Sequence, residues 1–288
     1  MESKGVLPSS DKESLAVNYV CMVGTSEPMD PEKYPVLKDD ISHVAQIVGE
    51  NKSYSWTSIS VKENRICWSV AQQLPDTLKK EDIVRNSEWG PEACESTIQE
   101  VSSFTNGFGG TLGDLIENTP RENISKVMLE EKLFQTWHHG RTVLIGDAAH
   151  KMLPSAGQGA VNAMQDAVIL ANCIYDLESY SSEALTAAFD DYWQQRYPQA
   201  KFQFEVSKFN GKIMSGQTWW ERVIRKVVFN YLPLWAHARM FIKSASYRPQ
   251  IAFLPEAPRR GTVDLLPLKP SVRYTQEQEA MKDTATGA

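Results

Sequence analysis

The chain has 288 residues, of which 42% are hydrophobic, and this length can bury one large core or two smaller ones. The 36 acidic and 30 basic residues give a formal net charge of −6. Such a chain lacks the basic surface that non-specific nucleic-acid binding needs, so no nucleic-acid partner is expected. The 4 cysteines form no C-x-x-C pair, which favours free, mostly buried thiols in an intracellular protein.

The first half of the chain carries the pattern of an antiparallel sheet. Residues 1–14 are polar, lack the apolar segment of a signal peptide, and are expected to be disordered. Apolar and β-branched residues at 15–24, 53–61 and 65–72 predict three strands, the last two joined by a hairpin turn. We therefore expect a sheet domain over residues 15–130.

A glycine-rich stretch follows a predicted helix near residues 91–105. The letters GFGGTLG, within residues 107–113, invite a dinucleotide-binding interpretation. Leu112 stands where the third glycine of that fingerprint belongs, and no strand precedes the stretch. The sequence therefore predicts an ordinary loop at 106–110.

The most informative segment reads RTVLIGDAAHKMLPSAGQGA, from Arg141 to Ala160. The β-branched run at 142–145 predicts a strand buried on both faces, ending at Gly146-Asp147. Small residues at three- and four-residue steps from Ala160 onwards predict a helix, whose free N–H groups favour negative charge at its start. The pattern suits a cradle for a flat ligand with a polyol chain; the alternative is an ordinary strand, loop and helix with a capping Asp147.

Fixed positions in this segment resemble a known family. The pattern GDAAH-x-x-x-P-x-x-GQG, followed by a D-A pair at Asp166, resembles the GD motif of flavin-dependent aromatic hydroxylases. The longer stretch LEEKLFQTWHHGRTVLIGDAAH and the later IAFLPEAPRRGTV are similar to the fungal branch with paxilline-type and meroterpenoid epoxidases. Four further positions fit the next helix of that branch, namely Phe189, Tyr192, Arg196 and Pro198.

The resemblance implies an FAD-dependent monooxygenase that uses NADPH and O2. Its substrate would be a hydrophobic, prenylated or terpenoid fungal secondary metabolite, with epoxidation of an alkene as the expected reaction. Asp147 would bind the ribityl hydroxyls, and the helix start would face the pyrimidine edge of the flavin. The cofactor-binding residues implied are Gly146, Asp147, Pro154, Gly157, Gly159 and Ala160. The resemblance names no catalytic residue.

The sequence also departs from the family pattern. Val161 stands where the family has Asn, and Gln165 stands where it has an acidic residue. The chain has no G-x-G-x-x-G opening a βαβ unit, so no N-terminal ADP-binding half is visible. Three explanations stay open: a fragment or a start further upstream, a naturally truncated relative, or a separate chain that supplies this half.

These departures keep two other functions in view. One is a non-redox relative that catalyses cyclisation or epoxide opening by acid–base and electrostatic means. The other is an inactive or partner-dependent fragment. A metal site is not expected, because His138, His139 and His150 match no compact zinc spacing.

The C-terminal part is expected to be helical. A helix over 181–197 should end at Pro198, and helices should fill residues 201–265, before a polar tail at 266–288. The aromatic and basic residues of 218–245 fit a helix lying in a membrane interface; the alternative is packing on the substrate domain. No uncharged apolar run is long enough to span a membrane, so the expected location is cytoplasmic or membrane-associated.

The expected fold class is therefore α+β or α/β. It combines an antiparallel substrate-domain sheet over 15–130, a remnant of a Rossmann-like FAD domain over 131–200, and C-terminal helices. A strand at 142–146 without its parallel neighbours would be an exposed edge. We therefore expect the chain alone to be marginally stable.

Overall fold

The computed structural model describes residues 7–49, 52–74, 94–216, 218–258 and 260–286. The chain divides into two compact units, which are described separately. The sheet unit comprises Ala16–Glu130 and Gly211–Arg225. The helical unit comprises Met1–Leu15, Glu131–Asn210 and Lys226–Ala288.

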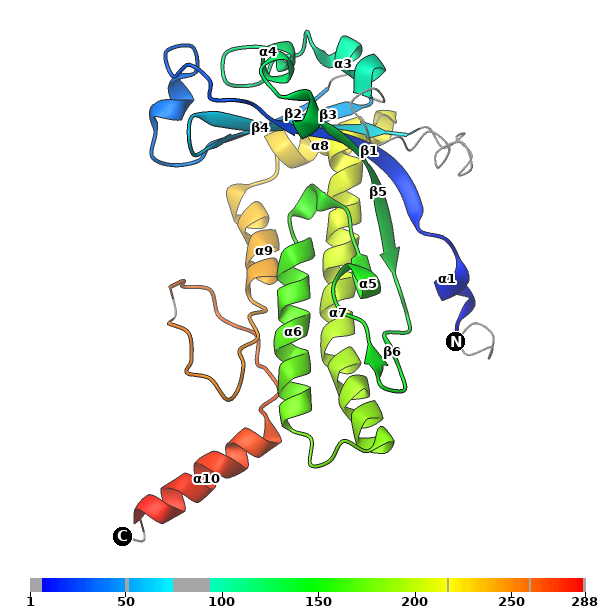
Figure 1. The fold of residues 1–288 in the computed structure, drawn as a ribbon, viewed down its shortest axis with the longest axis vertical. Coiled ribbons are helices and arrows are strands. Elements are labelled where there is room, and N and C mark those ends of the chain that lie inside the picture. Colours follow the sequence, from blue (N-terminus) through cyan, green and yellow to red (C-terminus); the bar gives the residue numbers. More distant parts are fainter. Residues whose placement is uncertain (1–6, 50–51, 75–93, 217, 259, 287–288) are drawn as a thin grey trace. The chain divides into compact units, whose positions relative to one another are not determined.

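The sheet unit is built on five strands in the order β2-β3-β4-β1-β5 (Figure 1). The strands are β1 (Ala16–Thr25), β2 (Val44–Val48), β3 (Tyr54–Val61), β4 (Arg65–Gln73) and β5 (Ser125–Leu133). The printed pairings of β2 with β3, β3 with β4 and β4 with β1 are antiparallel. The three strands predicted from the sequence are confirmed, whereas β2 and β5 were not predicted.

The predicted hairpin joins β3 to β4. Val61 pairs with Arg65, and the turn between them places Glu63 and Asn64 at φ 63° and 57°. Asn tolerates this left-handed conformation better than most residues, and a turn with positive φ matches the twist of the two strands. The hairpin is therefore fixed locally, before any long-range packing.

The helices α3 (Glu95–Val101) and α4 (Leu112–Glu117) pack on one face of the sheet (Figure 1). This face supplies the core of the unit, with Trp56 and Trp68 as its largest sheet residues. Tyr54 belongs to the same core, beside Phe104. Along β4, large buried residues alternate with smaller half-buried ones such as Cys67 and Ser69, which makes the sheet two-faced there.

The loop at 106–110 is confirmed as a self-contained turn. The Asn106 carboxamide oxygen accepts hydrogen bonds from the backbone N–H groups of Phe108 and Gly110. Thr111 then caps α4 in a reciprocal capping box with Asp114. The Asn106 side chain therefore stabilises the loop through hydrogen bonds to the loop's own backbone.

The helical unit contains α5 (Asp147–His150), α6 (Gly159–Tyr175), most of α7 (Ser182–Ser215), α9 (Leu234–Ala245) and α10 (Val272–Thr286). The helix α8 (Trp219–Asn230) continues from one unit into the other. Single 3-10 turns are η2 (Pro35–Lys38), η4 (Arg121–Asn123) and η5 (Pro154–Ala156). In Figure 1, α6 and α7 run side by side for most of the length of α6.

The prediction that a helix ends at Pro198 is wrong, because α7 continues through that proline. Proline inside a helix costs roughly 3 kcal/mol through its missing N–H and its ring. Pro198 is exposed, while Arg196 and Ala200 on either side of it are buried. Packing of the buried face of α7 outweighs the local cost on its outer face.

The prediction of a buried strand at 142–146 is also wrong. Only Thr142–Val143 forms a strand, β7, and it pairs antiparallel with β6 (His138–His139). Gly140 makes the turn at φ 56°, so the segment folds back on its own upstream neighbour. Thr142 is exposed and Ile145 is 41% exposed. Within the described residues, no parallel Rossmann-like sheet forms around this strand.

Both ends of the described chain are more ordered than their composition predicts. Within the expected disordered start, α1 (Ser9–Lys12) forms, and the Asp11 carboxylate accepts hydrogen bonds from the N–H groups of Gln135 and Thr136. Within the expected polar tail, α10 begins where Ser271 donates to Asp176. Side-chain hydrogen bonds to neighbouring segments hold both pieces.

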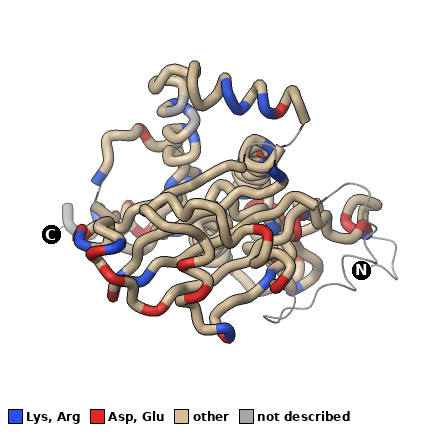
Figure 2. Tube along the Cα trace, turned by 90° about the horizontal axis from the view of Figure 1, so that it is seen from above, with Lys and Arg blue, Asp and Glu red and all other residues tan. Residues whose placement is uncertain are grey.

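The cysteines are free and mostly buried, as the sequence predicts. Acidic and basic residues are both spread over many parts of the described chain (Figure 2). The 4 cysteines are free; Cys21, Cys94 and Cys173 are buried and Cys67 is partly buried. Burial raises the pKa of the Cys21 thiol to about 11, which keeps it protonated at neutral pH.

Candidate functional site

The Gly146-Asp147 turn is the first part of the candidate site. Gly146 has φ 58° and ψ −140°, a conformation that essentially only glycine adopts. A Cβ at this position would lie 3.1 Å from the Cβ of Ala163, so the turn also sits close against α6. The Gly146 carbonyl accepts the N–H groups of Ala149 and His150, which starts α5. The turn therefore requires glycine for two separate reasons.

A buried carboxylate on α6 holds this turn. Asp166 Oδ2 accepts the Gly146 N–H at 2.8 Å and lies 2.6 Å from His150 Nε2. Its other oxygen, Oδ1, accepts from Arg196 Nε at 2.7 Å. The exposed fractions of the His150, Asp166 and Arg196 side chains are 1%, 0% and 0%. Three segments of the helical unit thus meet at one carboxylate.

The same arginine extends the network along α6. Arg196 Nη2 donates to the backbone and side-chain oxygens of Asn162, at 3.3 and 3.0 Å. Asn162 lies one helical turn before Asp166, so the planar guanidinium bridges residues one turn apart on α6. This bond set fixes α7 against the start of α6.

The charges around Asp166 keep it ionised. Burial alone would raise its pKa, but the hydrogen bond and charge of His150, the charge of Arg196 and the Gly146 N–H together hold the pKa below its usual range. An ionised carboxylate only accepts hydrogen bonds, so His150 Nε2 carries the proton that they share. The network is therefore fully oriented at neutral pH.

Aromatic rings close the network from the side of β6. Trp137 is 1% exposed, and its ring centre lies 5.3 Å from that of His150 and 5.7 Å from that of Tyr192. The Tyr192 hydroxyl donates to the Leu144 carbonyl at 3.2 Å. These contacts exclude water from the Asp166 network and fix the backbone that leads into Gly146.

The loop between α5 and α6 is anchored by α7. Ser155 Oγ donates to the Ser207 carbonyl at 2.6 Å, and Ser207 Oγ donates back to the Leu153 carbonyl. Gly157 closes the η5 turn at φ 62°, where its N–H donates to the Pro154 carbonyl. The loop therefore has a defined shape with Pro154 exposed on it.

The six residues that the sequence singled out lie along one continuous turn–loop–helix segment. Gly146 is buried, whereas the side chains or backbones of Asp147, Pro154, Gly157 and Ala160 are exposed. A Cβ added to Gly157 or Gly159 would meet nothing within 4 Å. The space beside the loop and the start of α6 is therefore open, which fits a flat ring and a polyol chain approaching the backbone closely.

Sequence reasoning missed the residues that support this segment. Asp166 was noted only as part of the D-A pair, and Arg196 only as a match to the following helix. The signal was present in the four-residue spacing of Asn162 and Asp166, which puts both on one face of α6. Of the two departures from the family pattern, Val161 is exposed, and Gln165 donates to the Tyr247 carbonyl.

His138 and His139 belong to no metal-binding cluster among the described residues. His138 Nε2 lies 2.9 Å from Asp190 Oδ1. No cluster of three or more His, Cys, Asp or Glu side chains suited to a metal ion occurs in the described part of the chain. His138 is therefore assigned to a partly exposed ion pair between the β6 segment and α7.

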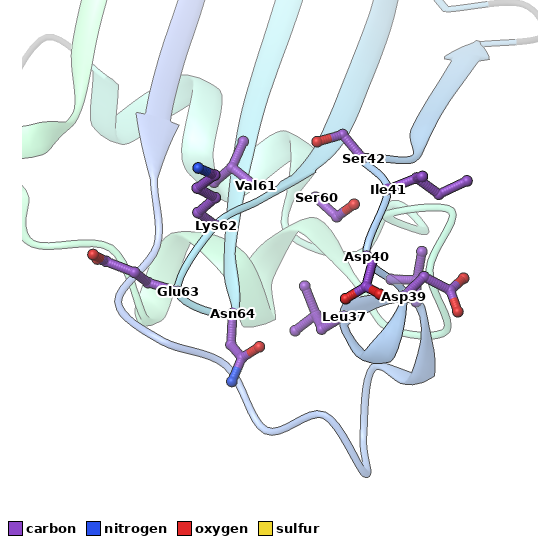
Figure 3. Close-up of a pocket in the computed structure, with 11 residues that line it drawn as sticks. Leu37, Asp39, Asp40, Ile41, Ser42, Ser60, Val61, Lys62, Glu63 and Asn64 are labelled. Carbon is purple, nitrogen blue, oxygen red and sulfur yellow. The ribbon is translucent and has the colours of Figure 1, made fainter.

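A separate pocket of about 480 Å³ lies in the sheet unit. Its walls come from the η2 segment and the β3–β4 hairpin, and Figure 3 shows Asp39, Asp40 and Lys62 among them. Asp39 also pairs with His43 at 2.8 Å. None of the six predicted cofactor-binding residues belongs to this pocket.

Comparisons with known proteins place the chain in a family. The FAD binding domain family matches residues 42–205. The FAD-dependent monooxygenase atmM of Aspergillus flavus is 30% identical over 264 residues, which cover 89% of this chain and 52% of that protein. The FAD-dependent monooxygenase paxM of Penicillium paxilli is 30% identical over 210 residues, 68% of this chain and 40% of its own length. The chain thus spans about half the length of such relatives.

Solved structures share the fold at lower identity. CtdE in complex with FAD and a substrate has a TM-score of 0.58 and 16% identity, over 83% of this chain and 57% of that one. Klebsiella pneumoniae HpxO in complex with FAD and uric acid has a TM-score of 0.53 and 19% identity, over 76% of this chain and 52% of that one. The chain therefore belongs to the FAD binding domain family, among the relatives of the fungal FAD-dependent monooxygenases atmM and paxM.

Proposed function

We propose that this chain provides the ribityl- and isoalloxazine-binding part of an FAD-dependent monooxygenase. One observation supports this above all: an exposed Asp147 beside an open, glycine-lined loop, on a turn that a buried network holds. The Asp147 carboxylate would accept hydrogen bonds from ribityl hydroxyls. Pro154 and Gly157 would line the ring, and the N–H groups of Gly159 and Ala160 would face its pyrimidine edge. The start of α6 favours negative charge there.

The bound flavin, reduced by NADPH, would supply activation of O2 and transfer of one oxygen atom to the substrate. The residues of this chain would orient the ring and keep water from the reacting atoms. The proposed substrate is a hydrophobic, terpenoid or prenylated fungal metabolite, and the proposed reaction is epoxidation of an alkene. These finer assignments rest on the resemblance to the fungal enzymes.

The sheet unit is proposed to bind the substrate, and its face opposite α3 and α4 suits that role. Along this face, Thr57 of β3 pairs with Ser69 of β4, which pairs with Val23 of β1. All three residues are half-buried and smaller than the tryptophans on the opposite face. Small side chains on this face would suit contact with a bulky apolar ligand.

A flavin titration tests the proposal. The assigned residues would contact the ring and ribityl chain but not an ADP group, so riboflavin, FMN and FAD should bind with closely similar affinities. Asp147→Ala should weaken all three by about tenfold or more, because hydrogen bonds to a charged group are worth about 1.5–3 kcal/mol. Flavin fluorescence and absorbance near ~450 nm report binding, since the bound oxidised ring keeps its own chromophore.

The matched control is Asp176→Ala, which removes the same charge at the other end of α6. It should leave flavin affinity unchanged. Strong preference for FAD would show an ADP site within these 288 residues and would correct this part of the proposal. Absence of binding by any flavin would instead favour the alternatives, a non-redox relative or a piece that needs a partner carrying the ADP-binding half.

A membrane surface is the second partner that we propose. No described helix is both long and apolar enough to cross a bilayer. Exposed aromatic residues nevertheless lie along residues 226–245 of the helical unit, including Tyr231 at 77% and Trp235 at 66% exposure. Basic residues accompany them, with Lys226 on α8 and Arg239 on α9 both exposed. Such helices bind anionic membrane interfaces and would bring the enzyme to an apolar substrate.

Vesicle sedimentation tests this contact. The chain should bind vesicles that contain phosphatidylserine more tightly than pure phosphatidylcholine vesicles, and added salt should weaken the difference. Tyr231→Ser combined with Trp235→Ser should reduce binding by about tenfold or more, because each buried aromatic ring contributes about 1.5–3 kcal/mol. Tyr180→Ser, also at an exposed aromatic position, is the control. Equal binding by the two variants would count against this membrane surface.

A further inference from the structure

The strongest unassigned feature of the helical unit is the buried carboxylate of Asp166, which bonds to the Gly146-Asp147 turn of the proposed flavin site. Asp166 contacts no open surface, since its side chain is fully buried. It nevertheless bonds directly to the backbone of Gly146, the residue before the exposed Asp147. We propose that Asp166 is a positioning residue, which sets the direction of Asp147 by fixing the Gly146 peptide. This inference rests on the proposed flavin site.

The geometry gives Asp166 unusual control over that peptide. Gly146 has free access to many backbone conformations because it lacks a side chain. In this structure its N–H is bound by Asp166 at 2.8 Å and its carbonyl by the N–H groups of Ala149 and His150. The carboxylate therefore selects one conformation from many, and that conformation decides where the next side chain lies.

The remaining bonds to Asp166 tie the turn to two helices. His150 lies at the end of α5, which begins at Asp147, and its Nε2 shares Oδ2 with the Gly146 N–H. Arg196 brings α7 to Oδ1 at 2.7 Å. The residue before α5 and the last residue of α5 thus both bond to Asp166 Oδ2 on α6. The start of α6 forms the other side of the proposed cradle. Asp166 thereby fixes the position of the Gly146-Asp147 turn relative to the start of α6.

Asn at position 166 is the most informative substitution. Its single carbonyl oxygen can replace only one of the two carboxylate oxygens, so either the Gly146 N–H or Arg196 loses its acceptor. Hydrogen–deuterium exchange of the apo chain should show amides of residues 146–150 exchanging at least about tenfold faster in Asp166→Asn. Flavin affinity should fall by about tenfold, because the turn no longer presents Asp147 in one direction.

The matched control is Asp176→Asn, which removes a carboxylate on the same helix that accepts from Ser271 and from the N–H groups of Val272 and Arg273. It should change exchange near residues 271–273 but not at 146–150, and should leave flavin binding intact. If Asp166→Asn does not fold, Asp166→Asn combined with Arg196→Met removes the unpaired buried cation and is measured in its place. The same fast exchange at 146–150 is expected.

Two results separate this inference from the proposed function. Unchanged exchange at 146–150 in the Asp166 variants would overturn the positioning role, whatever happens to flavin affinity. If the wild-type chain binds no flavin, the proposed function fails for this chain, while faster exchange at 146–150 still supports Asp166 as the residue that sets the turn. If exchange rises but flavin affinity holds, the turn is tethered without positioning Asp147, and the inference is overturned.

Discussion

Replacing Arg196 with methionine is expected to lower the free energy of unfolding by about 3–5 kcal/mol, the cost of breaking a buried ion pair from one side. The guanidinium has no exposed surface and holds Asp166 Oδ1 at 2.7 Å and Asn162 Oδ1 at 3.0 Å. Methionine fills much of the same volume but donates no hydrogen bond. It would leave a buried carboxylate with only His150 and the Gly146 N–H to balance it.

Urea denaturation followed by circular dichroism measures this loss. Arg196→Lys keeps the charge but not the planar fork, so its stability should fall between those of the wild type and Arg196→Met. The control, Arg273→Ala, breaks an exposed pair with Glu277 and should leave the denaturation midpoint unchanged. A loss no larger for Arg196→Met than for Arg273→Ala would show that the network contributes little to folding.

The sheet shows where local sequence is sufficient and where it fails. β4 alternates between buried and half-buried residues, and β1 and β3 are short runs rich in β-branched and aromatic residues, so the local sequence predicts all three. β2 is short and exposes Val44, and β5 carries charges along its length, so neither has a clear period. Both depend on pairing with a neighbour, which a single sequence does not show.

The candidate site divides in the same way. The short helix α5 was not predicted, but the loop after it, up to Ala160, was predictable because its proline and glycine positions determine its shape. The support for that segment was not, because Arg196 lies 30 residues after Asp166 and meets it only through the packing of α7. The same packing carries α7 past Pro198, which local propensity alone predicts as its end.

The second large effect is expected at Trp137. Replacing it with alanine should cost about 3–5 kcal/mol, as large-to-small changes at buried aromatic positions do. The indole is 1% exposed, lies between the rings of His150, Tyr192 and Tyr197, and donates its N–H to the Phe134 carbonyl. The cavity would open next to the Asp166 network, and water entering it would compete for the buried hydrogen bonds.

Chemical denaturation of Trp137→Ala beside Trp219→Ala gives the comparison, since both lose an indole but Trp219 is 73% exposed. Only the Trp137 variant should lose stability. Its loss should also be non-additive with that of Arg196→Met, because both changes disrupt one packed network, whereas Trp219→Ala should add independently. Full additivity of the Trp137 and Arg196 effects would mean that the aromatic wall and the buried ion pair stabilise the fold separately, and that the indole does not shield the carboxylate.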